Sequence, residues 1–223
     1  MIGTPRVHHR LTDSTNERAR GLAAAGAPHG TLVTADEQAA GRGRQGRPWT
    51  APAGSAVLMS LVLRELDELL PLAAAVAVCE ALPVDAAVKW PNDVWIERRK
   101  AAGILVEGRP QEGWAVLGLG INVTTTEFPP ELADRATSLH LSGAETGSDQ
   151  VLADVLRSLS EWLGASSAAV LSAWRSLDAL KGERVRWSGG EGTADGIDDS
   201  GALRVQTPDG PVTLDAGEVH LLR

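Results

Sequence analysis

The chain has 223 residues, enough for one sizeable hydrophobic core and a small appended domain. Hydrophobic residues make up 43% of it and charged residues 22%, which is typical of a folded globule and excludes a largely disordered chain. The net charge of -8 argues against a broad nucleic-acid surface, so any basic site must be local. No run approaches the roughly 20 apolar residues of a membrane span, and the N-terminus has no apolar signal segment, so we expect a cytoplasmic protein.

Cysteine and lysine are both scarce. A single cysteine, Cys79, rules out an intramolecular disulfide and a cysteine-rich metal site. Only three lysines, Lys89, Lys100 and Lys181, stand against eighteen arginines. Because arginine supplies generic positive charge in this chain, each lysine raises the question of whether an ammonium group is specifically required.

The first predicted element is a helix that begins at Ser14 and continues to Gly26. Ser14 is suited to cap its N-terminus, and Glu17 stands where it can complete a capping box. The β-rich run that follows predicts a strand ending near Gln38.

Alternating strands and helices are predicted over the next part of the chain. A buried strand is expected at 55–64, and a buried helix at 71–82, where Pro71 suits the first helical turn. Short β segments separated by turn signals follow at 86–90, 93–98, 101–108 and 114–123, and two further helices at 148–164 and 168–180.

The composition changes at Lys181. Residues 181–223 form short β runs broken by Gly-Gly, Asp-Ser-Gly and Pro-Asp-Gly turns, with no helical period. They predict a small β-barrel that relies on the main domain for stability. The whole chain is therefore predicted to be α+β, with a mixed β-sheet flanked by helices over 1–180 and an all-β domain over 181–223.

The segment AGRGRQGRPW, residues 40–49, places three arginines and three glycines within seven positions. Its glycines fit the dinucleotide pattern G-x-G-x-x-G, but Pro48 and Pro52 disfavour the helix that this interpretation needs. A solvated flexible loop is a second interpretation. The third is a mobile cover that orders when a compact anion binds its guanidinium and backbone N–H groups.

A second segment, KWPND, spans Lys89 to Asp93. Taken alone it predicts a tight hairpin, because Pro and Asn favour an extended exit followed by a turn. However, Lys100 follows Lys89 by eleven residues, so two of the three lysines flank this turn. Across a hairpin the two ammonium groups can face one site.

Further polar groups and glycines can enter the same cleft. The strand segment GLGIN, Gly118 to Asn122, allows close approach of a ligand or of another backbone. Gln38 at a strand end and Ser14-Thr15-Asn16 at a helix start are candidate ligand-binding groups, although each also has an ordinary role as a surface or capping residue.

In combination, Ser-Thr-Asn, Gln-x-x-Gly-Arg-Gly-Arg-x-Gly-Arg-x-Trp, Lys-Trp-Pro-Asn-Asp, Lys-x-x-Gly-Ile-Leu and Gly-x-Gly-Ile-Asn resemble the biotin protein ligases in order and spacing. The resemblance implies a class II synthetase-like catalytic domain followed by an SH3-like C-terminal domain. It also implies a reaction in which biotin and MgATP give biotinyl-5'-adenylate and pyrophosphate. A lysine of the biotin carboxyl carrier domain of a carboxylase then attacks the adenylate.

The resemblance assigns roles residue by residue. Catalysis is expected from Arg42, Arg44 and Lys100, with Asp93 positioning Mg²⁺ or the incoming lysine. The residues expected to bind biotin are Ser14, Thr15, Asn16, Gln38, Arg42, Gly43, Arg44, Lys100, Gly103, Leu105 and Gly118. Those expected to bind ATP and the adenylate are Arg44, Arg47, Trp49, Lys89, Asn92, Asp93, Lys100 and Asn122. The resemblance also implies that Mg²⁺ arrives with ATP and not in a protein cage, which explains why the sequence shows no dedicated ligand cluster.

One feature departs from some members of that family. Members that also repress transcription carry a DNA-binding domain before the Ser-Thr-Asn segment, whereas thirteen residues precede Ser14 here, too few for a helix-turn-helix. We therefore expect no nucleic-acid partner, no tightly bound prosthetic group, and a monomer or homodimer. The alternatives are a lipoate or octanoate protein ligase, whose family lacks the Gly-Arg-Gly-Arg run, and a non-catalytic biotin-responsive regulator.

Overall fold

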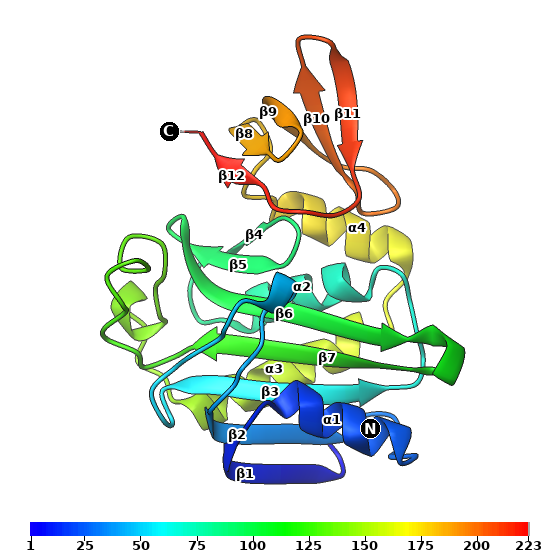
Figure 1. The fold of residues 1–223 in the computed structure, drawn as a ribbon, viewed down its shortest axis with the longest axis vertical. Helices are drawn as coiled ribbons and strands as arrows, with labels where there is room; N and C mark the ends of the chain where they lie inside the picture. Colours follow the sequence, from blue (N-terminus) through cyan, green and yellow to red (C-terminus); the bar gives the residue numbers. More distant parts are fainter. Residues whose placement is uncertain (223) are drawn as a thin grey trace.

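The computed structural model describes residues 1–222, which form two β-sheets and four α-helices (Figure 1). The larger sheet has seven strands in the order β1-β2-β3-β7-β6-β5-β4. It contains β1 (Arg6–Thr12), β2 (Leu32–Gln38), β3 (Ala56–Leu63), β4 (Ala87–Lys89), β5 (Asp93–Ile96), β6 (Arg99–Arg109) and β7 (Trp114–Asn122).

The central strands of this sheet pair antiparallel, and β3 and β7 are buried along their whole length. Only β1 and β2 run parallel. The strand β1 has no counterpart among the predicted elements, because its sequence RVHHRLT lacks the apolar alternation of a half-buried strand. Only Thr12 of this strand is buried, so β1 forms because β2 offers it a free edge and not because it contributes to the core.

The helices cover the two faces of the larger sheet unequally. Helix α1 (Thr15–Ala24) packs against β2, β3 and β7 on one face, whereas α2 (Leu70–Ala81) and α3 (Ser148–Trp162) cover the other (Figure 1). Helix α2 is apolar apart from Glu80, as expected for a helix packed between the sheet, α3 and α4 (Ser167–Ser176). The α1 face is therefore the one left accessible to a ligand.

The C-terminal part forms a five-stranded antiparallel sheet, and its hydrophobic core is continuous with that of the larger sheet. A hydrogen bond also joins the two sheets, from the indole Nε1 of Trp90 to the carbonyl of Gly201 at 3.1 Å. The C-terminal module thus shares its core with the main domain. Its strands are β8 (Arg184–Trp187), β9 (Gly190–Ile197), β10 (Leu203–Thr207), β11 (Gly210–Leu214) and β12 (His220–Leu221).

Several local predictions need correction. Ser14 does occupy the N-cap of α1, but its side chain makes no capping hydrogen bond, and Glu17 pairs with arginines and forms no capping box. Strand β6 is longer than the predicted 101–108, because its pairing with β7 continues to Arg109.

Within residues 1–222, none of the helices is long and apolar enough to span a membrane.

We predict that Trp90→Phe lowers the free energy of unfolding by about 1–2 kcal/mol, because it removes the hydrogen bond to Gly201 and part of a fully buried ring. Urea denaturation monitored by circular dichroism measures this change. Trp187→Phe, which alters a half-buried indole inside the C-terminal module, should cost less. Equal losses in the two variants would contradict a linking role for Trp90.

Candidate active site

Three glycines on the central strands, Gly103, Gly118 and Gly120, leave a strip of the α1 face of the sheet without side chains, and we call this strip the groove. Gly103 of β6 pairs with Gly120 of β7, and Leu105 pairs with Gly118. The ring of Trp49 lies in this groove: a Cβ added at Gly120 would come 2.4 Å from Trp49 Cε2, and one at Gly103 would come 3.0 Å from its Cζ3. Position 120 therefore requires glycine while Trp49 occupies this place, whereas a Cβ at position 103 would require the ring to move by a few tenths of an ångström.

Lys89 and Lys100 converge on one carboxylate, as the hairpin prediction proposed. The Nζ of Lys100 lies 2.6 Å from Asp93 Oδ1, and the Nζ of Lys89 lies 3.9 Å from Asp93 Oδ2. Asp93 pairs with Lys89 across β4 and β5 and with Gly103 across β5 and β6, so the strand register places the three charges together.

The environment of Lys89 disfavours its charged form. Burial lowers the pKa of Lys89, and the nearby Lys100 and Arg47 lower it further, whereas Asp93 raises it in part. In the opposite direction, its ammonium lies 5.5 Å from the centroid of the Trp95 ring, a cation–π position that favours the charged form. Lys89 is thus held among positive charges that a bound anion can relieve.

The cationic loop, residues 39–55 between β2 and β3, closes on itself in a short turn. The N–H of Gly43 donates to the carbonyl of Arg47 at 2.7 Å, around the 3₁₀ turn η1 (Arg44–Gly46). Gln45 adopts a left-handed conformation with φ of 56°, and Gly46 has φ of 75°. The structure therefore gives the loop an ordered turn, while its predicted mobility stays a prediction.

Each arginine of the cationic loop is directed to a different element. Arg44 donates to Asn92 Oδ1 at 3.1 Å, Arg42 lies 3.3 Å from Glu17 of α1, and Arg47 forms an ion pair with Glu218 of the C-terminal module. Burial lowers the pKa of Arg44, and Asp93 opposes this effect. Of the three arginines, Arg44 is the one whose hydrogen bond, to Asn92, brings it to the cluster formed by Asp93, Lys89 and Lys100.

Asn92 fixes the position of that cluster relative to the groove. Its Nδ2 donates to the carbonyl of Ile104 at 2.8 Å, while its Oδ1 accepts from Arg44. Asn122, by contrast, is buried at the end of β7, and its Nδ2 donates to the carbonyl of Thr137 at 3.0 Å. The structure therefore gives Asn122 a role in anchoring the segment that follows β7.

The start of α1 carries a buried polar cluster. The N–H and hydroxyl of Thr15 both donate to Gln38 Oε1, at 2.7 and 3.1 Å. The hydroxyl of Ser60 lies 2.6 Å from Asn16 Oδ1 and 2.8 Å from Thr15 Oγ1. Ser14 is also buried, at 2% exposure. Thr15, Asn16, Ser60 and Gln38 thus form one hydrogen-bonded group at the start of α1, and the role of the Ser-Thr-Asn segment and Gln38 in binding a ligand stays a prediction.

The glycine at position 118 makes room for this cluster. A Cβ there would come 2.1 Å from Asn16 Oδ1, so no larger residue fits beneath the amide. Half-buried Leu105, its partner on β6, supplies apolar surface beside it. This end of the groove therefore combines polar groups with an apolar wall.

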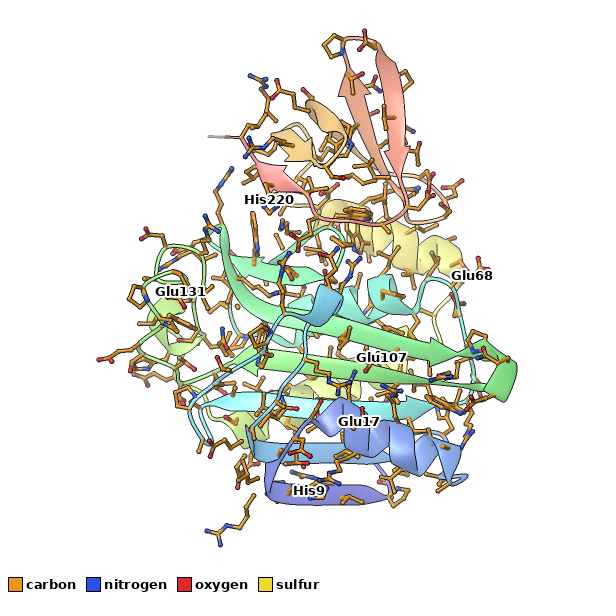
Figure 2. The ribbon with its side chains drawn as sticks, viewed as in Figure 1. His9, Glu17, Glu68, Glu107, Glu131 and His220 are labelled. Atoms are coloured by element: carbon orange, nitrogen blue, oxygen red, sulfur yellow. The ribbon has the colours of Figure 1, made fainter. Side chains whose placement is uncertain are left out.

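Positive charge extends from the hairpin to the C-terminal module. His220, labelled in Figure 2, faces the hairpin from β12. Burial lowers its pKa first, and Lys89, Arg47, Arg186 and Arg135 lower it further. The C-terminal module therefore borders the cationic end of the site.

Sequence reasoning missed several residues of the site. The glycine pattern of GLGIN already contained Gly120, although its role as a seat for Trp49 depends on the β6–β7 register. The others come from distant parts of the chain. The spacing of Glu17 indicated a capping box and not a site residue, and the sequence around the remaining three shows no motif; they are Ser60, Glu107 and Glu218.

Comparisons with known proteins identify the family of this chain. The model of the Biotin/lipoate A/B protein ligase family matches residues 8–123, and that of the Biotin protein ligase C terminal domain matches residues 182–222. The chain therefore belongs to the biotin/lipoate A/B protein ligase family. Within that family, its C-terminal module is of the biotin protein ligase type.

Relatives support this assignment over nearly the whole chain. The biotin--[acetyl-CoA-carboxylase] ligase of Mycobacterium tuberculosis is 35% identical, covering 95% of this chain and 87% of that protein. The bifunctional ligase/repressor BirA of Bacillus subtilis is 34% identical, covering 99% of this chain and 75% of that protein. Among solved structures, the biotin protein ligase from Aquifex aeolicus in complex with biotin and ATP has a TM-score of 0.86 at 31% identity, covering 99% of both chains.

We predict that Gly120→Ala displaces Trp49 and loosens the cationic loop, because the added methyl group would overlap the indole ring. Trypsin should then cleave after Arg42 and Arg44 several-fold faster. Gly108→Ala is the matched control on β6, since its Cβ would come no closer than 3.7 Å to Pro110. Unchanged cleavage in Gly120→Ala would show that Trp49 does not hold the loop.

Proposed function

We propose that the protein activates biotin with MgATP to biotinyl-5'-adenylate and then transfers biotin to a lysine of a carboxylase's biotin carboxyl carrier domain. The observation that supports this most directly is the convergence of Lys100 and Lys89 on Asp93, with Arg44 bonded to the neighbouring Asn92, beside a groove with polar groups at its far end. A polar head, an apolar body and an anionic tail are the features such a groove can bind.

The first step must bring a carboxylate against a triphosphate, and like charges repel. Arg42, Arg44 and Lys100 can neutralise this charge as the biotin carboxylate attacks the α-phosphorus and pyrophosphate leaves. No enzyme nucleophile is required, because catalysis here consists of positioning and charge stabilisation. The Lys100 ammonium lies against Asp93, so the substrate oxygens compete with this carboxylate for it.

We assign the biotin head to the end of the groove at α1, where Ser14, Thr15, Asn16 and Gln38 meet. The ring and valeryl chain then lie along Gly118, Leu105 and Gly103, which brings the carboxylate toward Lys100. Arg42, Gly43 and Arg44 cover the tail and the new phosphate. Trp49 must shift within the groove or form one of its walls when biotin enters.

We assign ATP to the hairpin side, with Arg47, Trp49, Lys89, Asn92 and Asn122 around the nucleotide. Mg²⁺, brought by the triphosphate, supplies further charge neutralisation. Among residues 1–222, no group of three or more His, Cys, Asp or Glu side chains is placed to hold a metal. Asp93 is the carboxylate best placed to help hold that ion or to receive the incoming carrier lysine.

The reaction is tested by mixing the protein with MgATP and either biotin or lipoate, then measuring pyrophosphate release and label transfer to a carrier domain. We expect release and transfer with biotin only. Release with lipoate only would reassign the substrate to the sister ligases. Biotin binding with no release from either acid would indicate a non-catalytic regulator.

We predict that Lys100→Ala slows adenylate formation at least about 100-fold, because it removes the ammonium that balances the developing charge. Single-turnover pyrophosphate release measures the rate, and thermal melting checks that the fold is retained. Lys181→Ala removes the same charge outside the site and serves as the control. Wild-type turnover in Lys100→Ala would refute the role assigned to this lysine.

A further inference from the structure

Glu107 is a carboxylate of β6 that faces α1, and the proposed reaction gives it no role. Its side chain is 29% exposed and points toward the start of α1, where Glu17 also lies (Figure 2). One oxygen, Oε2, accepts from Asn16 Nδ2 at 2.8 Å, and the other, Oε1, lies 3.5 Å from Arg20 Nη1. Both oxygens are thus directed at donors.

The contacts of Glu107 determine which way the Asn16 amide faces. A carboxylate only accepts hydrogen bonds, so it requires the NH₂ side of the amide. The amide oxygen is then directed to the opposite side, where the Ser60 hydroxyl lies 2.6 Å away. Rotating the amide by 180° would bring two acceptors together at Glu107, which is unfavourable.

The amide oxygen lies above the floor of the groove. Ser60 and Gly118 are register partners on β3 and β7, and Asn16 Oδ1 fills the space that a Cβ on Gly118 would occupy. A carbonyl oxygen has two lone pairs, and Ser60 uses one of them. Within residues 1–222 no second donor is bonded to this oxygen, and Asn16 is buried, so a donor could reach the other lone pair only by entering beside Leu105.

We propose that Glu107 is a positioning residue that holds Asn16 with its oxygen, and not its nitrogen, toward the head of biotin. The inference rests on the proposed function. The head of biotin is a cyclic urea with two N–H donors, so an acceptor fixed in this orientation complements it. The dithiolane ring of lipoate has no N–H group, which makes the same oxygen a determinant of specificity.

The chain also shows how the orientation is lost if the carboxylate is replaced. In Glu107→Gln, Arg20 binds the amide oxygen of the new glutamine and leaves its NH₂ toward Asn16. Asn16 then turns its oxygen to the glutamine and its nitrogen to Ser60, whose hydroxyl can accept and donate onward to Thr15 Oγ1 at 2.8 Å. The groove would present a donor where biotin needs an acceptor.

The experiment measures steady-state pyrophosphate release as a function of biotin and of ATP concentration. For Glu107→Gln we expect the KM for biotin to rise about threefold to tenfold, the worth of one hydrogen bond, with kcat and the KM for ATP unchanged. The control is Glu112→Gln, which removes another carboxylate that accepts one side-chain N–H, from Trp114 at the far end of the β6–β7 hairpin.

A second variant separates orientation from loss of packing. In Asn16→Asp combined with Glu107→Gln, the glutamine donates to one oxygen of the new carboxylate at position 16, and the other oxygen faces the groove whichever way that carboxylate turns. We expect this double variant to recover most of the biotin KM that Glu107→Gln loses. Asn16→Asp alone, which sets two carboxylates against each other, should bind biotin more weakly than the double variant.

The outcomes distinguish the inference from the function on which it rests. If the wild-type protein releases pyrophosphate with biotin but Glu107→Gln keeps the wild-type biotin KM, the inference is wrong and the function stands. A fall in kcat and in melting temperature without a change in biotin KM would show a structural role only. No biotin-dependent release from the wild-type protein would overturn the proposed function itself.

Discussion

Positive charge must be concentrated at one point of a protein whose net charge is -8, and Asp93 makes this possible. Its carboxylate lies between the ammonium groups of Lys89 and Lys100, and Arg44 reaches the same hairpin through Asn92. Without an anion between them, such cations repel one another at short range. This arrangement depends on the β4–β5 hairpin, on the register of β6 and on the path of the cationic loop. An anionic substrate would take over part of the charge compensation that Asp93 provides.

Much of this arrangement could be predicted from local sequence. The buried strands at β3 and β7 and the apolar helix α2 follow from continuous hydrophobic runs, which tertiary packing only reinforces. The approach of Lys100 to Lys89 was predicted from the KWPND turn, because the two lysines flank it and can face one site across a hairpin. The glycines of GLGIN were expected to admit a ligand or another backbone, and in the structure the side chains of Asn16 and Trp49 lie against them. In each case the information lies within a dozen residues of the feature.

The remaining parts depend on partners far apart in the chain. Asn16 and Glu107 are separated by 91 positions, and nothing near either residue indicates the other. Glu17 suits a capping box by its spacing, yet arginines from α1 and from the cationic loop compete for its carboxylate. Strand β1 is polar and exposed, so its formation depends on the free edge of β2 and not on its own composition. Such features require the three-dimensional pairing before they can be recognised.

The indole N–H of Trp49 is buried and has no hydrogen-bond partner in the described structure, while its ring rests on Gly103 and Gly120. An unpaired buried donor costs about 1–3 kcal/mol, which weakens this resting position. The ring of Trp49 thus occupies part of the groove, and Trp49 itself belongs to the cationic loop. A ligand that needs this place must displace the ring, and its measured association constant is then the intrinsic constant multiplied by the fraction of molecules in which the ring has moved away. Changes that alter only this fraction would shift binding without touching any residue that contacts the ligand.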